Sequence, residues 1–125
     1  PEDRNGLLVP EDRLTKMIRK YPVLIAEVYF PTYEMQKIAL EASLMNLSLI
    51  RNVDVRIQFE LVELNGEFLT LLPYPPDEVK KAAIKSKPEV VLSMLKCNDP
   101  SMKPTEDMIK LAIELQPSLL TYFLN

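Results

Sequence analysis

The sequence predicts an all-α fold, an α-solenoid of about five helix-turn-helix repeats. The 125-residue chain repeats itself about every 22 residues. Its eleven prolines and two glycines suit helix starts and short connections better than β-hairpin turns. Within each copy, apolar residues recur at helical spacing. The copies begin at Val9, Pro31, Val53, Pro75 and Pro104.

The last two copies show the common plan most clearly. Segments 75–94 and 104–123 both open with a proline, continue with an acidic pair and a Lys-x-Ala-Ile motif, and carry a second proline thirteen positions later. Segment 31–50 keeps Pro-Thr, Met and Lys-x-Ala, and segment 53–72 keeps Glu-Leu and Leu-Thr. A unit this short cannot bury its own apolar face, so we expect it to be stabilised by stacking on its neighbours.

Each copy is expected to open with an amphipathic helix of about three turns. The predicted helices begin near residues 10, 32, 54, 76 and 105. In the last copy the apolar residues fall at i, i+3, i+4 and i+7. Thr32 and Thr105 are candidate N-caps, and the carboxylates of Glu106 and Asp107 suit the positive end of a helix dipole. The apolar residues that set this helical period are Met108, Leu111, Ala112 and Leu115.

The first helix of each copy should end before Pro22, Gly66, Pro88 and Pro117. Proline lacks an amide donor, and glycine tolerates the left-handed geometry of a C-terminal turn. Leu44 is the exception, so we expect a less sharp break in that copy. After each break, apolar residues at i, i+1 and i+4 predict a second helix of about two turns. In the last copy these residues are Leu119, Leu120 and Phe123.

The repeats are expected to form a single domain over residues 9–125, preceded by a flexible arm at 1–8. Arg13 and Lys16 occupy positions that are apolar in other copies, which is typical of a polar cap on the first repeat. The last copy ends in apolar residues with no polar unit beyond it, which indicates a partner surface, a dimer contact or a missing continuation. The chain opens on Pro1 and not on methionine, which suggests an upstream segment.

The repeat motif resembles a known family. The pattern Pro-x-x-Glu-Val-x-x-x-Ala-Ile/Val-x-x-x-Pro/Gly-x-x-Leu-x-x-Leu is clearest at 75–95 and at 53–72. It is similar to short helix-turn-helix repeats of unknown function found in phage, giant-virus and some bacterial proteins. The resemblance covers residues 9–124. It implies an α-solenoid and a viral or phage origin, and it carries no active site that could be transferred to this chain.

The residue types argue against catalysis. The chain has no histidine, so no Ser-His-Asp or Cys-His arrangement is possible. Two glycines leave no glycine-rich phosphate loop. The acidic pairs at helix starts are explained by dipole and capping effects. We therefore expect no catalytic residue, no cofactor and no metal site, and we expect that the protein is not an enzyme.

Charge and cysteine content bear on partners and compartment. A net charge of −3 argues against a general surface for nucleic acid or anionic membranes. No apolar run approaches the roughly 20 residues that cross a bilayer. The single cysteine rules out an internal disulfide and favours a reducing compartment. The sequence predicts a cytoplasmic protein, in the host cytoplasm if it is viral.

Protein binding is the predicted function, because a solenoid presents an extended surface and catalytic groups are missing. The sharper version is a phage or viral accessory protein that engages a host factor, and a homo-oligomer through the C-terminal repeat is also considered. The alternative is a single-stranded nucleic-acid-binding repeat protein that reads bases with two residues per unit. Those two columns are Leu14, Gln36, Gln58, Lys80 and Ile109, and Tyr21, Ser43, Asn65, Lys87 and Gln116.

The partner-binding residues are expected in the C-terminal third. The insertion 97–103 is the longest connection, and long loops on rigid arrays often display binding residues. The apolar end of the last copy is the second expected contact region. The predicted partner-binding residues are Cys97, Asn98, Asp99, Met102, Lys103, Leu120, Tyr122 and Phe123.

Overall fold

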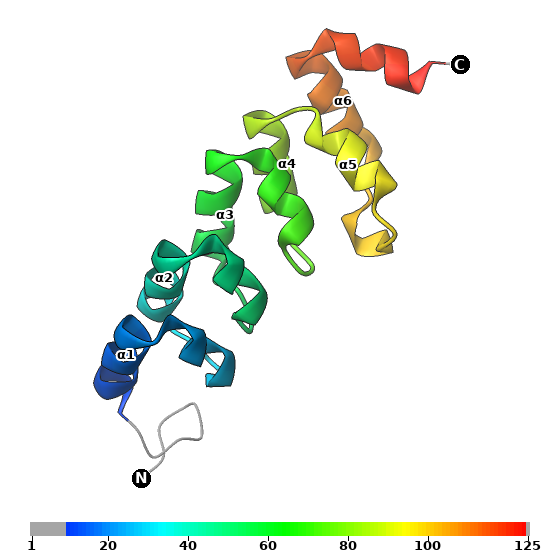
Figure 1. Ribbon diagram of the computed structural model, residues 1–125. Coiled ribbons are helices and arrows are strands. Elements are labelled where there is room, and N and C mark those ends of the chain that lie inside the picture. Colours follow the sequence, from blue (N-terminus) through cyan, green and yellow to red (C-terminus); the bar gives the residue numbers. More distant parts are fainter. Residues whose placement is uncertain (1–9, 125) are drawn as a thin grey trace. The chain divides into compact units, whose positions relative to one another are not determined.

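The computed structural model describes residues 10–124, which contain eleven helical segments and no strand (Figure 1). The predicted all-α fold of helical repeats is confirmed. The predicted arm at 1–8 lies outside the described residues. The segments are α1 (Glu11–Lys20), η1 (Pro22–Glu27), α2 (Tyr33–Ala42), η2 (Leu44–Leu49), α3 (Val55–Leu64), η3 (Gly66–Leu71), α4 (Asp77–Ser86), α5 (Val90–Lys96), η4 (Pro100–Met102), α6 (Glu106–Leu115) and η5 (Pro117–Phe123).

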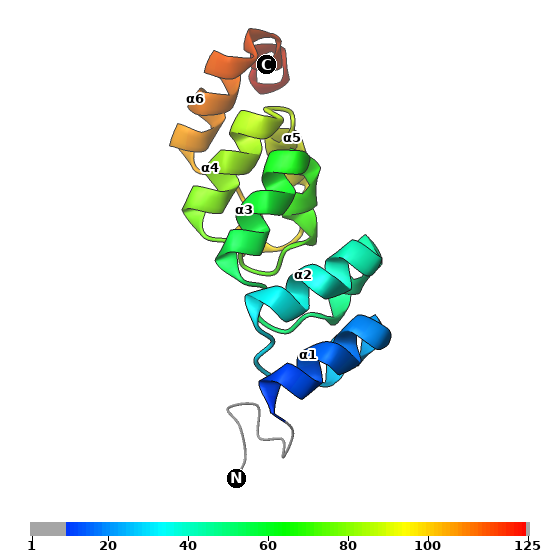
Figure 2. The same ribbon diagram turned by 90° about the vertical axis from the view of Figure 1, so that its left-hand side faces the viewer.

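The chain divides into two compact units, Pro1–Ile57 and Gln58–Asn125, with the boundary inside α3. In the first unit α1 lies beside α2, and each contacts η1 (Figure 2). In the second unit α4 contacts η3, α5 and α6. The single domain expected over residues 9–125 stays a prediction.

The first helix of every repeat begins where the sequence predicts it. The five long helices start at residues 11, 33, 55, 77 and 106, one position after the predicted starts. Thr32 and Thr105 are N-caps, since their hydroxyls accept the backbone N–H of Met35 at 3.1 Å and of Met108 at 3.2 Å. The N-caps and the 22-residue period therefore both determine where these helices begin.

The predicted second, shorter helix is present in every repeat, and in most repeats it is a 3₁₀ helix. Only α5, in the fourth repeat, is α-helical. In a 3₁₀ helix residues i and i+3 eclipse, so the buried face has a period of three. The buried pairs follow that period: Ile25 and Val28, Leu47 and Ile50, and Leu69 and Leu72. The i, i+1, i+4 pattern hides the shorter period because an apolar neighbour, Leu24 or Phe68, precedes the first and third pairs.

The second repeat is broken as sharply as the others, so the exception expected at Leu44 is wrong. Helix α2 ends at Ala42, and Ser43 accepts the N–H of Met45 with its hydroxyl at 3.2 Å. Asn65 makes the equivalent bond to the N–H of Glu67 at 3.0 Å. In the second repeat a short polar residue between the two helices therefore replaces proline or glycine as the breaking signal.

Gly66 serves close packing and not left-handed geometry, which corrects the sequence interpretation. A Cβ at Gly66 would lie 2.4 Å from the carbonyl oxygen of Ala83, too close for any side chain. Left-handed backbone occurs instead at Asn52, with φ of 55°, and at Tyr74, with φ of 48°. These two residues are 22 positions apart, so the turn between repeats is also part of the repeated plan.

The outer face of α1 is polar, as predicted. Arg13 and Lys16 are exposed, whereas Met35 and Ile38, at the same register of α2, are 0% and 9% exposed. The opposite side of α1 buries Leu14 and contacts α2. The first repeat thus has one apolar stacking side only.

Pro76 begins the fourth repeat without a side-chain cap. Its backbone angles, φ −69° and ψ 161°, match those of Thr32, at −72° and 164°. Pro76 also stands in the register of Asp54, whose N–H is accepted by Oε1 of Gln36. Because proline has no N–H, the equivalent bond is missing, and Oε1 of Gln58 is buried without one, although Gln58 has another interaction.

We expect Pro76→Thr to raise the free energy of unfolding by about 1 kcal/mol. The threonine hydroxyl would cap α4, as Thr32 caps α2. The lost rigidity of proline in the unfolded chain offsets part of the gain. Urea denaturation should rank Pro76→Thr above Pro76→Ala, which restores the N–H but not the cap. Equal stability of the two variants would show that the cap contributes nothing here.

Candidate functional site

The first column considered for base reading is mostly buried: Leu14, Gln36, Gln58 and Lys80 are buried and Ile109 is half-buried. Gln36 is 1% exposed, and its side chain donates to the carbonyl of Pro31 at 3.1 Å and accepts the N–H of Asp54 at 2.9 Å. Lys80 is 7% exposed and donates through Nζ to the carbonyl of Ser101. Lys80 is therefore buried, whereas the nearby Lys81 and Lys85 are exposed. These polar residues link one repeat to the turn that follows.

The second column lies at the ends of the first helices. Ser43 and Asn65 use their side chains to cap the following 3₁₀ helix. Lys87 lies 3.6 Å from the carboxylate of Glu67. Residues that are committed to capping or to contacts between repeats are poorly placed to read bases.

The insertion 97–103 is tied to the repeat beside it. Asp99 accepts the N–H of Ser101 at 2.9 Å, a bond that lowers the pKa of this carboxyl below its usual value. Met102 is 2% exposed, and Nζ of Lys103 donates to the carbonyl of Leu95 at 2.6 Å. Of the predicted residues here, Asn98 is exposed and Cys97 is half-buried. Much of this loop therefore serves packing, and its role in partner binding stays a prediction.

The three predicted residues near the C-terminus differ in exposure. Tyr122 is 69% exposed and Leu120 is 44% exposed, whereas Phe123 is half-buried. All three belong to η5, whose buried anchor is Leu119. Leu120 and Tyr122 are therefore accessible, as a contact surface requires.

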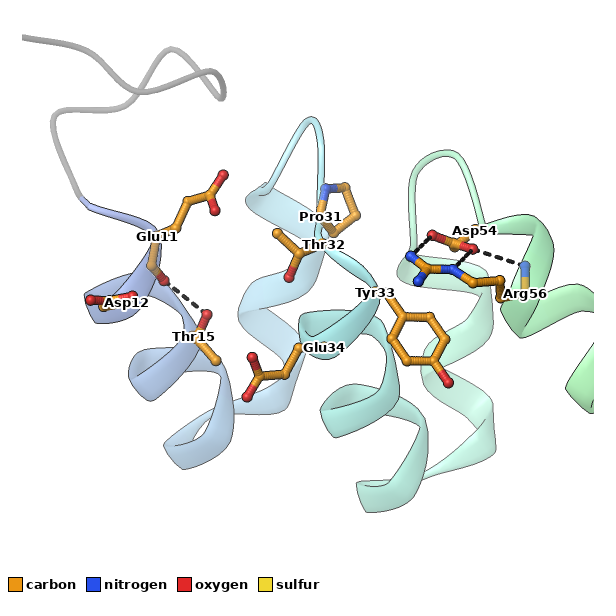
Figure 3. A pocket seen from close by; sticks show the side chains of 9 residues that line it. All are labelled: Glu11, Asp12, Thr15, Pro31, Thr32, Tyr33, Glu34, Asp54 and Arg56. Carbon is orange, nitrogen blue, oxygen red and sulfur yellow. Dashed lines mark hydrogen bonds and ion pairs between the residues drawn. The ribbon is translucent and has the colours of Figure 1, made fainter.

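A groove crosses the starts of three successive helices in the first unit (Figure 3). Its volume is about 470 Å³. Helix α1 contributes Glu11, Asp12 and Thr15, the segment before α2 and its first turn contribute residues 31–34, and the start of α3 contributes Asp54 and Arg56. In Figure 3 the carboxylate of Glu34 points toward α1. The 22-residue period brings these first-turn positions together on one face.

Arg56 closes one end of the groove. Its guanidinium donates to both carboxylate oxygens of Asp54, at 3.0 and 2.8 Å, and stacks over the ring of Tyr33 at 4.3 Å from the centroid. The hydrogen bonds from Arg56 lower the pKa of Asp54 below its ordinary value. Asp54 therefore stays charged at neutral pH, and Arg56 is already committed to it.

Negative charge dominates the groove. Four carboxylates and one guanidinium line it. Each helix start contributes about half a positive charge. The three helix starts and Arg56 together therefore do not balance the negative charge of the four carboxylates. A smaller hollow beside it also includes Lys16 and Arg19, and Arg19 lies 3.7 Å from Glu34 in an exposed pair. Such exposed pairs contribute little energy, so they leave Glu34 accessible.

The sequence interpretation missed this site because it assigned first-turn carboxylates to helix stability alone. The available signal was that Asp12 and Glu34 share one register and so lie on neighbouring helices. Among the described residues no group of three or more metal-ligand side chains is arranged to hold an ion.

Comparisons with known proteins add no relative. No family model, curated protein or solved structure matches this chain. The resemblance to short viral and bacterial helical repeats thus stays a prediction. None of the described helices has the length and hydrophobicity needed to cross a bilayer.

Proposed function

We propose that this protein is a non-catalytic protein-binding module, and that the groove at the starts of α1, α2 and α3 receives a positively charged segment of a partner protein. The observation that carries the proposal is the excess of carboxylates in that groove. A lysine- or arginine-rich segment would gain charge-assisted hydrogen bonds there. The accessory role toward a host factor in a phage or viral setting remains part of the proposal and rests on the family resemblance.

Three features favour protein over nucleic acid as the partner. The groove is negatively charged, so phosphates would be repelled. Polar residues of the columns considered for base reading already form hydrogen bonds within the chain, as Gln36 and Lys80 illustrate. Exposed Lys81 and Lys85 on α4 have no aromatic residue between them to stack on bases.

The proposal predicts that removing two groove carboxylates weakens binding of a short arginine-rich peptide. The variant Asp12→Asn with Glu34→Gln keeps side-chain shape and removes two charges. The dissociation constant, measured by fluorescence anisotropy at low salt, should rise by about tenfold, since each exposed ion pair contributes up to about 1 kcal/mol. Added salt should reduce the difference by screening.

The matched control is Glu106→Gln with Asp107→Asn. Both carboxylates lie in the first turn of α6, in the second unit, and both are exposed; Asp107 stands in the register of Asp12 and Glu34. The control changes net charge equally and should bind the peptide as the parent does. An equal loss in both variants would mean that the peptide senses only total charge, and the groove proposal would be wrong.

A further inference from the structure

Asn65 and Gly66 form an Asn-Gly step between α3 and η3. Asn65 is exposed, whereas Gly66 is buried. In such a step the backbone nitrogen of glycine can attack Cγ of the asparagine side chain, because glycine has no Cβ to hinder the approach. A C–N bond forms, the side-chain nitrogen leaves as ammonia, and the product is a five-membered succinimide ring. Water opens this ring at one carbonyl to give aspartate, or at the other to give isoaspartate, whose main chain runs through the former side chain.

The other described asparagines are less suited to this reaction. Each is followed by a residue whose side chain hinders the attacking nitrogen. Asn46 is also buried, and its Nδ2 donates to the carbonyl of Ala39 at 2.8 Å. A second Asn-Gly step, at residues 5 and 6, lies outside the described residues. The less suited asparagines are Asn46, Asn52 and Asn98, followed by Leu47, Val53 and Asp99.

The native backbone keeps the reacting atoms of Asn65 and Gly66 apart. Ring closure needs the nitrogen of Gly66 and Cβ of Asn65 on the same side of the Cα–C bond that joins them. With ψ of 116° at Asn65, that nitrogen points well away from Cβ. The side chain is also held, because Oδ1 accepts the N–H of Glu67 at 3.0 Å as the N-cap of η3. The reaction therefore requires a large backbone rotation at Asn65.

Gly66 cannot follow that rotation while η3 stays packed on α4. Its α-carbon lies so close to the carbonyl of Ala83 that no side chain fits between them. The segment η3 also contacts α4 and α5 along the chain that follows. Rotation at Asn65 would move Gly66 out of this contact. Deamidation should therefore proceed from a state in which η3 has opened locally from α4.

We propose that Asn65 is a modification site whose deamidation is gated by the opening of η3 from α4, and that the isoaspartate product prevents η3 from repacking. Isoaspartate adds one methylene to the main chain immediately before Gly66, where the backbone fits most closely against Ala83. The aspartate product keeps the original main chain. Its carboxylate can still accept the N–H of Glu67, since aspartate and asparagine are equivalent N-caps. The two products therefore differ in their effect on the fold.

Peptide mapping by mass spectrometry, after incubation at mildly alkaline pH, tests the gating. Deamidation at Asn65 should be at least about tenfold faster in denaturing guanidinium chloride than in buffer, because the required opening is then complete. In the denaturant, Gly66→Ala should slow the reaction, since the new Cβ hinders the attacking nitrogen and folding no longer matters. Equal rates in buffer and in denaturant would overturn the gating. An Asn65 that stays intact in denaturant would overturn the site itself.

The structural effect of isoaspartate is tested on the modified protein after chromatographic separation. The matched control is Asn65→Asp, which has the same charge and an unaltered main chain. The isoaspartate form should unfold at a lower urea concentration than Asn65→Asp, as measured by circular dichroism. Equal midpoints would contradict the proposed loss of packing between η3 and α4. All these residues lie in the second unit, so this proposal and that of the groove in the first unit can fail independently.

Discussion

Replacing Gly66 with alanine is expected to lower the free energy of unfolding by about 3 kcal/mol, the largest effect we predict. The new Cβ would lie 2.4 Å from the carbonyl oxygen of Ala83 and 3.0 Å from Cβ of Lys87. The carbonyl of Ala83 is a rigid backbone group that accepts the N–H of Lys87 at 2.8 Å. Relief of the clash therefore requires η3 and α4 to move apart. Urea denaturation followed by circular dichroism measures the change.

Leu44 provides the matched control, because it opens η2 as Gly66 opens η3. Its side chain is 48% exposed, so Leu44→Ala leaves only a small cavity. The expected change is below about 1 kcal/mol. A similar loss in both variants would show that residues at this register respond to size in general, and that the contact between Gly66 and Ala83 has no special role.

The substitution Gln36→Leu is expected to cost about 2 kcal/mol. It removes the bond from Nε2 to the carbonyl of Pro31 and the bond that Oε1 accepts from Asp54. Leucine fits the space, since Leu14 is buried at the same register of α1. The loss therefore reports hydrogen bonding and not packing. Hydrogen exchange should also show a less protected amide at Asp54.

Glu41→Leu is the control for that variant. It makes the same kind of polar-to-apolar change on the same helix, at an exposed position. Its effect should stay within about 0.5 kcal/mol. If Gln36→Leu is as stable as this control, the polar column does not link the repeats.

Much of the helical architecture could be predicted from the sequence because it depends on local signals. The 22-residue period, the threonine caps and the proline breaks each act within a few residues of the helix that they define. Thr32 and Thr105 bond to atoms three positions away, so their role is visible in the sequence. The starts of all five long helices were predictable for that reason.

Features that depend on contact between repeats were not predictable. Lys80 looks like one of several surface lysines, yet it is buried because the insertion supplies the carbonyl of Ser101. Gly66 looks like a turn residue, yet the approach of Ala83 explains it. Met102 looks like an exposed loop residue, yet it is 2% exposed. The partners of Lys80 and Gly66 lie 21 and 17 residues away in other elements, beyond the reach of local patterns.

Only part of the candidate groove could be predicted from the sequence. Asp12 and Glu34 could be aligned by register, which places them on adjacent helices. The hollow between them depends on how α1 and α2 pack and on the side chain of Arg56, which bonds to Asp54 and leaves the other carboxylates facing the groove. A repeat alignment therefore predicts the charge of the site but not its shape.

Chemical-shift mapping tests the central claim most directly. The ¹⁵N-labelled protein is titrated with the arginine-rich peptide, and backbone amide shifts are recorded at each step. The proposal predicts the largest changes at Asp12, Thr15 and Glu34, which line the groove. Changes centred on Leu120 and Tyr122, or no localised changes at saturating peptide, would contradict binding at the groove.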